Sequence, residues 1–249
     1  GMLDFLLAER EAGRIRNLGF SYHGDIAVFD HLLAQHDRYK WDFVQIQLNY
    51  VDWKHAKEVN TRNTDAEYLY GELEKRGIPA VIMEPLLGGR LADPPVQVKK
   101  ALPKNRTPVE WAFDYLWCLP ETGPVLSGMS TMQQLEDNLV YADRAKADML
   151  RRSEMDTLVQ ARRIFQTMAL VPCTKCGYCM PCPAGIDIPK VYEAYNMTAC
   201  KPMEEAKAAY AALEVKADAC LLCGQCERAC PQHIAPGASM TAAAKAFRD

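Results

Sequence analysis

Eight of the ten cysteines fall in two short runs with nearly the same spacing. The downstream run holds Cys220, Cys223, Cys226 and Cys230 and ends at Pro231, which is the pattern C-x2-C-x2-C-x3-C-P. Three closely spaced thiolates can ligate three irons of one cuboidal iron–sulfur cluster. In two-cluster ferredoxins the fourth cysteine of such a run ligates the other cluster. The pattern therefore predicts a partner run elsewhere in the chain.

The partner run lies upstream, at Cys173, Cys176, Cys179 and Cys182, and is followed by Pro183. Two residues separate its last two cysteines, whereas three residues separate those of the downstream run. The two runs therefore differ in spacing at Cys182. Crossed ligation predicts two [4Fe–4S] clusters. The expected ligand sets are Cys173, Cys176, Cys179 with Cys230, and Cys220, Cys223, Cys226 with Cys182.

Zinc and disulfides are the alternatives for these cysteines. Paired CxxC motifs also build tetrahedral zinc sites, but zinc needs four ligands and has no use for a third cysteine and a proline in each run. The N-terminus shows no signal-peptide pattern, so an oxidising compartment is not expected. Cys118 and Cys200 lie outside both runs, and we expect them to be small packing residues.

The composition limits the classes of partner. The chain has 249 residues, of which 49% are hydrophobic, and 29 basic residues stand against 32 acidic ones. This balance argues against binding to nucleic acid or to an anionic membrane surface. No apolar run approaches the roughly 20 residues of a membrane span. We therefore expect a cytoplasmic protein.

Strand and helix patterns alternate along the first part of the chain. This order indicates βα units and a parallel sheet. Thr107, Pro108 and Glu110 together form a helix-start signal with a capping box. Strands are predicted at 14–20, 42–49, 80–83 and 125–127, and helices at 2–13, 25–35, 64–76, 107–118 and 132–141.

The rest of the chain is helical in pattern. Helices are predicted within 143–168 and, between the cysteine runs, at 188–200 and 204–213. Two helices of this length between the runs are typical of an α-helical ferredoxin. The predicted fold is α/β: a partial, half TIM-type (βα) barrel over 1–145, followed by an all-α two-cluster ferredoxin-like domain over 146–249.

Short motifs at the predicted strand ends carry a family resemblance. They lie at 19–21 (GFS), 43–45 (FVQ), 84–89 (EPLLGG) and 126–139 (LSGMS to LEDNL). In this order they resemble the second half of an aldo/keto reductase barrel. Together with the cysteine runs, the chain resembles the iron–sulfur branch of that family.

The resemblance implies a nicotinamide dinucleotide at the C-terminal face of the barrel, where such barrels carry their active sites. Ser21 and Gln45 match positions that contact the nicotinamide amide, and Gly88 and Gly89 match the loop near the pyrophosphate. The positions that match the adenosine pocket are Gly128, Ser130, Thr131, Asp137 and Asn138. The alternative is that these residues are only turns and helix caps.

The family's catalytic Asp, Tyr, Lys and His lie in barrel units that this sequence does not contain. His23 is the only histidine at the end of a predicted strand, and such a histidine is more often a loop residue than a catalyst. Three functions remain open. The chain is expected to be an iron–sulfur oxidoreductase, or a ferredoxin-like carrier or subunit whose barrel remnant is a docking scaffold, with a zinc-stabilised interaction module as the third alternative. The sequence identifies neither a redox partner protein nor a small-molecule substrate.

Four βα units cannot close a barrel that needs eight strands. Two parallel edges would stay open, and exposed edges favour aggregation or pairing with another chain. A homodimer that rebuilds the barrel is therefore expected, with coverage of the edges by other parts of the chain as the alternative.

Overall fold

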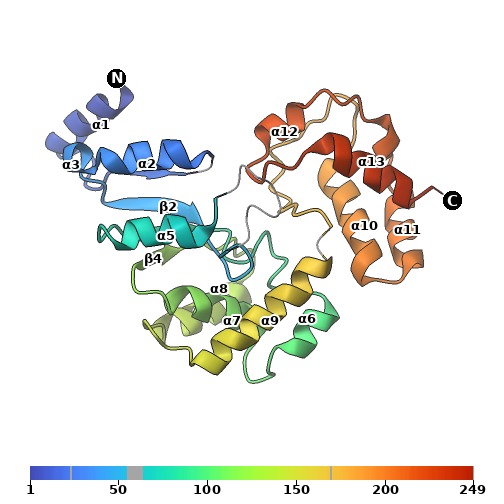
Figure 1. Ribbon diagram of the computed structural model, residues 1–249, viewed down its shortest axis with the longest axis horizontal. Helices are drawn as coiled ribbons and strands as arrows, with labels where there is room; N and C mark the ends of the chain where they lie inside the picture. The colour runs from blue at the N-terminus through green and yellow to red at the C-terminus, as the bar shows by residue number, and fades with distance from the viewer. Residues whose placement is uncertain (23, 55–63, 169, 249) are drawn as a thin grey trace. The chain divides into compact units, whose positions relative to one another are not determined.

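The computed structural model describes residues 1–22, 24–54, 64–168 and 170–248. The chain forms two compact units, which are described separately below. Unit 1 comprises 1–87 and 104–158, and unit 2 comprises 88–103 and 159–249. These units do not follow the predicted division at 145–146, because the segment 88–103 packs with the cysteine-bearing part of the chain. Figure 1 shows the elements in chain order.

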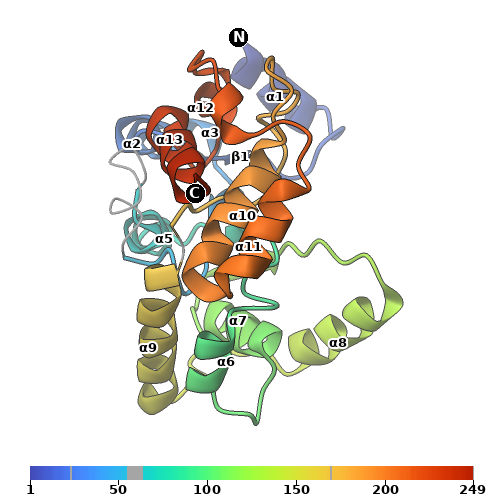
Figure 2. The same ribbon diagram turned by 90° about the vertical axis from the view of Figure 1, so that its right-hand side faces the viewer.

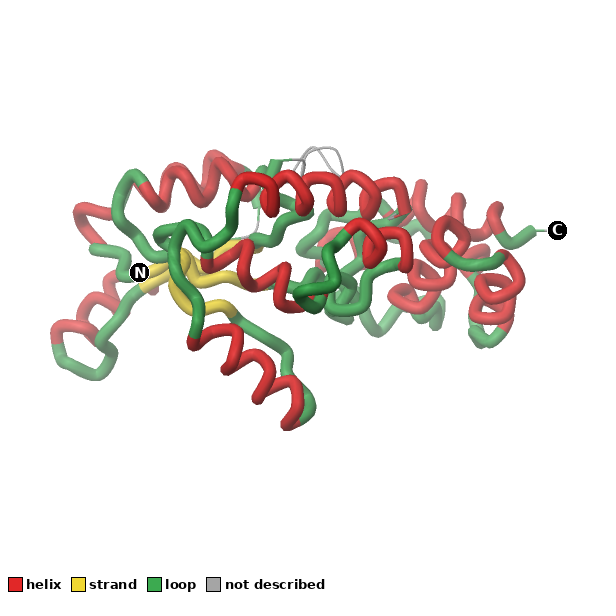
Figure 3. The backbone as a smooth tube through the Cα atoms, turned by 90° about the horizontal axis from the view of Figure 1, so that it is seen from below, coloured by secondary structure: helices red, strands yellow, loops and turns green. Residues whose placement is uncertain are grey.

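The described residues of unit 1 contain a parallel four-stranded sheet in the order β1-β2-β3-β4, seen in yellow in Figure 3. Its strands are β1 (Gly19–Ser21), β2 (Phe43–Gln47), β3 (Ala80–Met83) and β4 (Thr122–Val125). The helices of this unit are α1 (Met2–Glu11), α2 (Ile26–Ala34), α3 (His36–Tyr39), α5 (Ala66–Glu74), α7 (Pro108–Trp117) and α8 (Met132–Asp143). The predicted α/β class with a parallel sheet is confirmed.

Two strand predictions were wrong in their bounds. Residues 14–18 lie outside β1, because the Leu18 N–H donates to the Asp42 carboxylate at 2.7 Å instead of joining the ladder. β4 begins at Thr122, earlier than the predicted 125, and pairs irregularly with β3. Gly123 permits this earlier start, since a Cβ at this position would lie only 3.2 Å from the Ala80 carbonyl oxygen.

The two faces of the sheet differ in character. Phe20 and Val44 are register partners on one face, where the Phe20 ring lies 6.5 Å from that of Phe29 in α2. The other face carries the partners Ser21 and Gln45, which are polar and not fully buried. The face covered by α2 therefore contributes to the apolar core, whereas the second face carries polar side chains that are available for contacts with a ligand.

The predicted capping box of α7 is present. The Glu110 N–H donates to Thr107 Oγ1, and the Thr107 N–H donates to the Glu110 carboxylate, both at 3.1 Å. This arrangement satisfies two backbone donors that a helix start would otherwise leave unpaired. The same helix packs into the core, where its side chains Trp111, Phe113 and Leu116 are almost fully buried.

A chain of ion pairs holds α7 to the flanking segments. Asp114 is fully buried and lies 2.9 Å from Arg106 and 3.1 Å from Arg144. Burial raises the pKa of Asp114, whereas the hydrogen bond from Arg106 holds the pKa of Glu154 at about 2. A buried carboxylate without a partner is costly, so the ion pairs with Asp114 hold Arg106 and Arg144 against α7. Arg106 also pairs with Glu154 and so connects this residue to the same helix.

Helix α9 (Arg152–Met168) runs from unit 1 into unit 2. Unit 2 also contains α6 (Val96–Ala101), α10 (Ile188–Cys200), α11 (Met203–Ala211), a 3₁₀ turn (Ala217–Ala219), α12 (Gln225–Ala229) and α13 (Pro236–Ala246). Helices α10 and α11 lie side by side in Figure 2, and α10 also packs against α13. The two helices predicted between the cysteine runs are therefore confirmed.

The core of unit 2 lies directly beneath the cysteines. Val191, Tyr192 and Ala243 are buried at its centre, and five of the eight clustered cysteines pack against this group. The short helix α12 was not predicted, because five residues are too few to show a hydrophobic period. None of the described helices is long and apolar enough to cross a membrane.

Candidate metal centre

All ten cysteines carry free thiols. In each predicted ligand set three cysteines are half-buried and one is exposed, namely Cys176 in one set and Cys223 in the other. The eight clustered thiols are therefore available for ligation. Cys118 is buried, and the Cys200 thiol donates to the Asn196 carbonyl at 3.5 Å, so both have the packing role that the sequence predicts.

The first cavity has an open volume of about 420 Å³ and is lined by thiols from both runs. Cys173, Cys176 and Cys179 border it from the upstream loop, and Cys230 borders it from the end of the downstream loop. Cys226 also reaches its edge. The remaining lining residues are Thr174, Gly177, Ile188, Pro189, Tyr192, Gln232 and Ile234.

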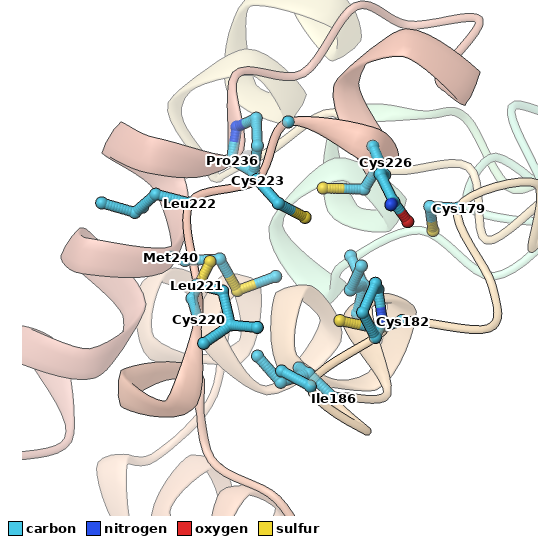
Figure 4. A pocket seen from close by; sticks show the side chains of 15 residues that line it. Cys179, Cys182, Ile186, Cys220, Leu221, Leu222, Cys223, Cys226, Pro236 and Met240 are labelled. Carbon is cyan, nitrogen blue, oxygen red and sulfur yellow. The ribbon is translucent and has the colours of Figure 1, made fainter.

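The second cavity is nearly the same size, about 430 Å³. Cys220, Cys223 and Cys226 border it from the downstream loop, Cys182 comes from the upstream loop, and Cys179 lies at its edge. In Figure 4 the sulfur atoms of Cys182, Cys223 and Cys226 face a shared space, whereas Leu222 extends away from it. Ile186 and Met240 close the apolar side.

Each cavity is lined by three thiols of one run and by the last cysteine of the other, while crossed ligation of a metal stays a prediction. Cys182 lies beside the downstream thiols even though its run is one residue short. Cys179, Cys226 and Ile188 border both cavities, so the two sites adjoin each other. Each site therefore draws its thiols from both loops.

The backbone of the two loops repeats as well. Lys175 and Leu222, at corresponding positions, have φ of 60° and 53°, and Gly177 and Gly224 have φ of 78° and 70°. Left-handed backbone costs a residue with a side chain roughly 1–2 kcal/mol. Both loops adopt this left-handed backbone at the same position, which indicates that the site requires this loop geometry. In the upstream loop this turn lets the Lys175 N–H donate to Cys173 Sγ at 3.4 Å.

Burial disfavours the ionised form of three of these thiols. It raises the pKa of Cys173 and of Cys226, and it raises the pKa of Cys179 to about 11. Thiolates are the metal-binding form, so a positively charged group must offset the cost of burying them. A set of half-buried thiols around an apolar cavity fits an iron–sulfur cluster in this respect.

The geometry is less suited to a single zinc ion. Zinc holds each sulfur about 2.3 Å away, so its ligand atoms must lie within about 4.6 Å of one another. In the part of the chain that the structure describes, no group of three or more His, Cys, Asp or Glu side chains is arranged to hold a single metal ion. Each cavity is instead bordered by four thiols drawn from both runs, with a fifth at its edge.

The predicted nicotinamide contacts meet at the strand ends of unit 1. Gln45 Nε2 donates to Ser21 Oγ and to the Met83 sulfur, both at 3.3 Å. These side chains come from three neighbouring strands and form one polar edge. His23, the one candidate catalytic histidine, lies outside the described residues.

The predicted adenosine-pocket residues are mostly engaged in local capping. Thr131 and Gln134 form the capping box of α8, and the Ser130 N–H donates to the Gln134 side chain at 2.8 Å. Asp137 accepts from Gln133, and Asn138 donates to Ser127 Oγ at 3.1 Å. The space around the Gly128 Cβ position is open. These contacts account for the residue types without a ligand, so a nucleotide role stays a prediction.

The predicted pyrophosphate glycines belong to unit 2. Gly88 has φ of 62°, and a Cβ built on it would lie 2.1 Å from the Thr174 carbonyl oxygen. Gly89 has φ of 84° with no atom within 4 Å of its Cβ position. Gly88 therefore provides close approach to the upstream cysteine loop, a role that the sequence did not indicate.

Comparison with known proteins agrees with this geometry. Residues 172–235, which span both cysteine runs, match the family model of a 4Fe-4S dicluster domain. The fold is similar to the aldo-keto reductase AKR11C1 from Bacillus halodurans in its holo form, with a TM-score of 0.51 and 17% identity over 64% of this chain. The apo form of that enzyme gives the same TM-score and identity. No curated protein sequence matches the chain.

The chain spans 54–55% of the length of these reductase structures. At this identity the likeness shows a shared fold and leaves activity open. The C-terminal part is a 4Fe–4S dicluster domain, and it accompanies a portion of an aldo-keto reductase barrel fold. The two together define an iron–sulfur redox protein.

Proposed function

We propose that the protein holds two [4Fe–4S] clusters and transfers single electrons through them. Cys173, Cys176, Cys179 and Cys230 hold one cluster. Cys182, Cys220, Cys223 and Cys226 hold the other. The observation that supports this most is the division of eight free thiols between two adjoining cavities of nearly equal volume. When bound, such clusters supply one-electron redox chemistry at each site.

The surrounding residues suit this task. Ile186, Ile188 and Met240 are almost fully buried and keep water away from the inner side of the cavities. Cys176 and Cys223 are exposed, so each site has one edge at the surface of unit 2 where a redox partner can approach. Cys179 and Cys226 border both cavities and provide a short route between them.

Metal analysis tests this proposal. Protein prepared without oxygen should contain about eight iron and about eight acid-labile sulfide per chain, from two four-iron clusters. Strict exclusion of oxygen is required, because exposed thiolates oxidise once a cluster is lost. Stoichiometric zinc without sulfide would rule the proposal out.

The electrons have two possible destinations. In the oxidoreductase form of the proposal, they pass to or from a nicotinamide dinucleotide or substrate at the strand ends of unit 1. The polar edge formed by Ser21 and Gln45 supports this form. In the second form the chain is an electron carrier or subunit, and the barrel portion is a docking scaffold. A ligand that binds the folded state raises the melting temperature, so a rise on adding NADPH, lost in Gln45→Leu, would support the first form. No rise would favour the second.

A homodimer is proposed from the open architecture of unit 1. In the described sheet β1 and β4 are the edge strands, and α8 buries none of its residues. Met132, Leu139 and Val140 on α8 are all at least 60% exposed. Light scattering should give about twice the 28.0 kDa chain mass. A single species at the chain mass over a wide concentration range would exclude the dimer.

A further inference from the structure

One buried hydroxyl beside the first cavity has no hydrogen-bond partner. Thr174 lies between the first two cysteines of the upstream run, lines the cavity of Cys173, Cys176, Cys179 and Cys230, and is only 5% exposed. Its Oγ1 is buried and makes no hydrogen bond within the described residues. A buried unpaired hydroxyl costs roughly 1–3 kcal/mol, so a native structure needs a reason to keep one.

The repeat of the two loops provides an internal comparison. Leu221 occupies in the downstream run the place that Thr174 occupies in the upstream run, and it cannot donate a hydrogen bond. The cysteines of the two sites fall in the same exposure classes, with one exposed and three half-buried in each. The two corresponding positions differ in burial as well as in chemistry, since Thr174 is 5% exposed and Leu221 is 68% exposed, and of the two only Thr174 can donate a hydrogen bond.

Both loops have a positively charged side chain nearby, and in the downstream loop Arg228 Nη1 lies 3.4 Å from the Cβ position of Gly224. In the upstream loop Arg90 lies over the Phe165 ring at 4.8 Å and lines a neighbouring cavity together with Cys173. Lys175 lines the same cavity, but its charge is balanced by Glu193 at 2.5 Å. A positive charge and a hydrogen-bond donor near the sulfurs both stabilise the more negative, reduced form of a cluster.

We infer that Thr174 donates an O–H···S hydrogen bond to the cluster of the first cavity and gives that cluster the higher reduction potential of the two. This inference rests on the two-cluster function proposed above. Electrons that enter at the downstream cluster then collect at the upstream one. Thr174 therefore influences the direction of electron flow, because it changes the reduction potential of the cluster beside it.

The test is a redox titration of the anaerobic full-length protein, followed by the EPR signals of the reduced clusters. The wild type should titrate as two components. Thr174→Val keeps the shape and removes the donor, and should lower the potential of the higher component alone. Thr174→Ser keeps the donor and should restore it. Unchanged potentials in Thr174→Val, at full iron and sulfide content, overturn the inference.

The exposed ligands give a second test that leaves Thr174 intact. Cys176→Ser should remove or shift the higher-potential component, and Cys223→Ser should remove or shift the lower one. The reverse assignment overturns the inference even if Thr174→Val fails to fold. Failure of the proposed function would look different, because a protein without iron and sulfide would show neither component.

Discussion

Replacing Cys230 with alanine should abolish the cluster of the upstream loop and spare that of its own run. The reason is that the Cys230 thiol lines the cavity of Cys173, Cys176 and Cys179, whereas Cys182 lines that of the downstream thiols. Iron and sulfide should each fall from about eight to about four per chain. Cys200→Ala is the control, because this thiol lies outside both cavities and should leave the content unchanged.

Pairs of substitutions identify which cluster is lost. Starting from Cys230→Ala, the further change Cys176→Ala should have no additional effect, while Cys223→Ala should remove the remaining cluster. Ligation within each run predicts the opposite order of effects. The same logic applied to Cys182→Ala tests the one position at which the two runs differ in spacing.

Gly88→Ala should destabilise unit 2 well beyond Gly89→Ala. Both glycines have positive φ, which costs alanine about 1–2 kcal/mol. Only at Gly88 would the new methyl overlap the backbone of the upstream cysteine loop, 2.1 Å from the Thr174 carbonyl oxygen. Forced shifts of this kind add about 1–3 kcal/mol.

Thermal unfolding at one scan rate, followed by loss of the cluster absorbance, compares the two variants. Since about 1 kcal/mol moves the melting temperature of a domain of roughly 100 residues by about 4–8 °C, Gly88→Ala should melt about 4–24 °C below Gly89→Ala. Equal melting temperatures would mean that the segment 88–103 does not support the cysteine loop.

The sequence predicted those parts of the molecule that follow from local chemistry. The cysteine spacing indicated the pairing of Cys182 with the downstream thiols, and the alternation of strand and helix patterns along the chain indicated β2 and β3. The capping box at Thr107 was also predictable, because it depends on residues three positions apart. The structure adds the contacts between segments that lie far apart in the sequence.

The positions that were missed depend on contacts far apart in the chain. Gly88 was predicted to lie near a pyrophosphate, yet it lies against Thr174, a contact that no local pattern encodes. The start of β1 depends on the Asp42 carboxylate, which caps Leu18 from 24 residues away. Thr174 itself looked like a neutral spacer between two cysteines, and only its burial without a partner gives it a role.

The central claim is that eight thiols build two sites that each accept one electron. Reductive titration of the anaerobic protein measures this capacity directly. We expect an uptake of about two electrons per chain, in two steps and reversible on reoxidation, because each [4Fe–4S] cluster accepts one. An uptake of no electrons by protein that retains its metal would contradict the account, and an uptake of one would leave only a single working site.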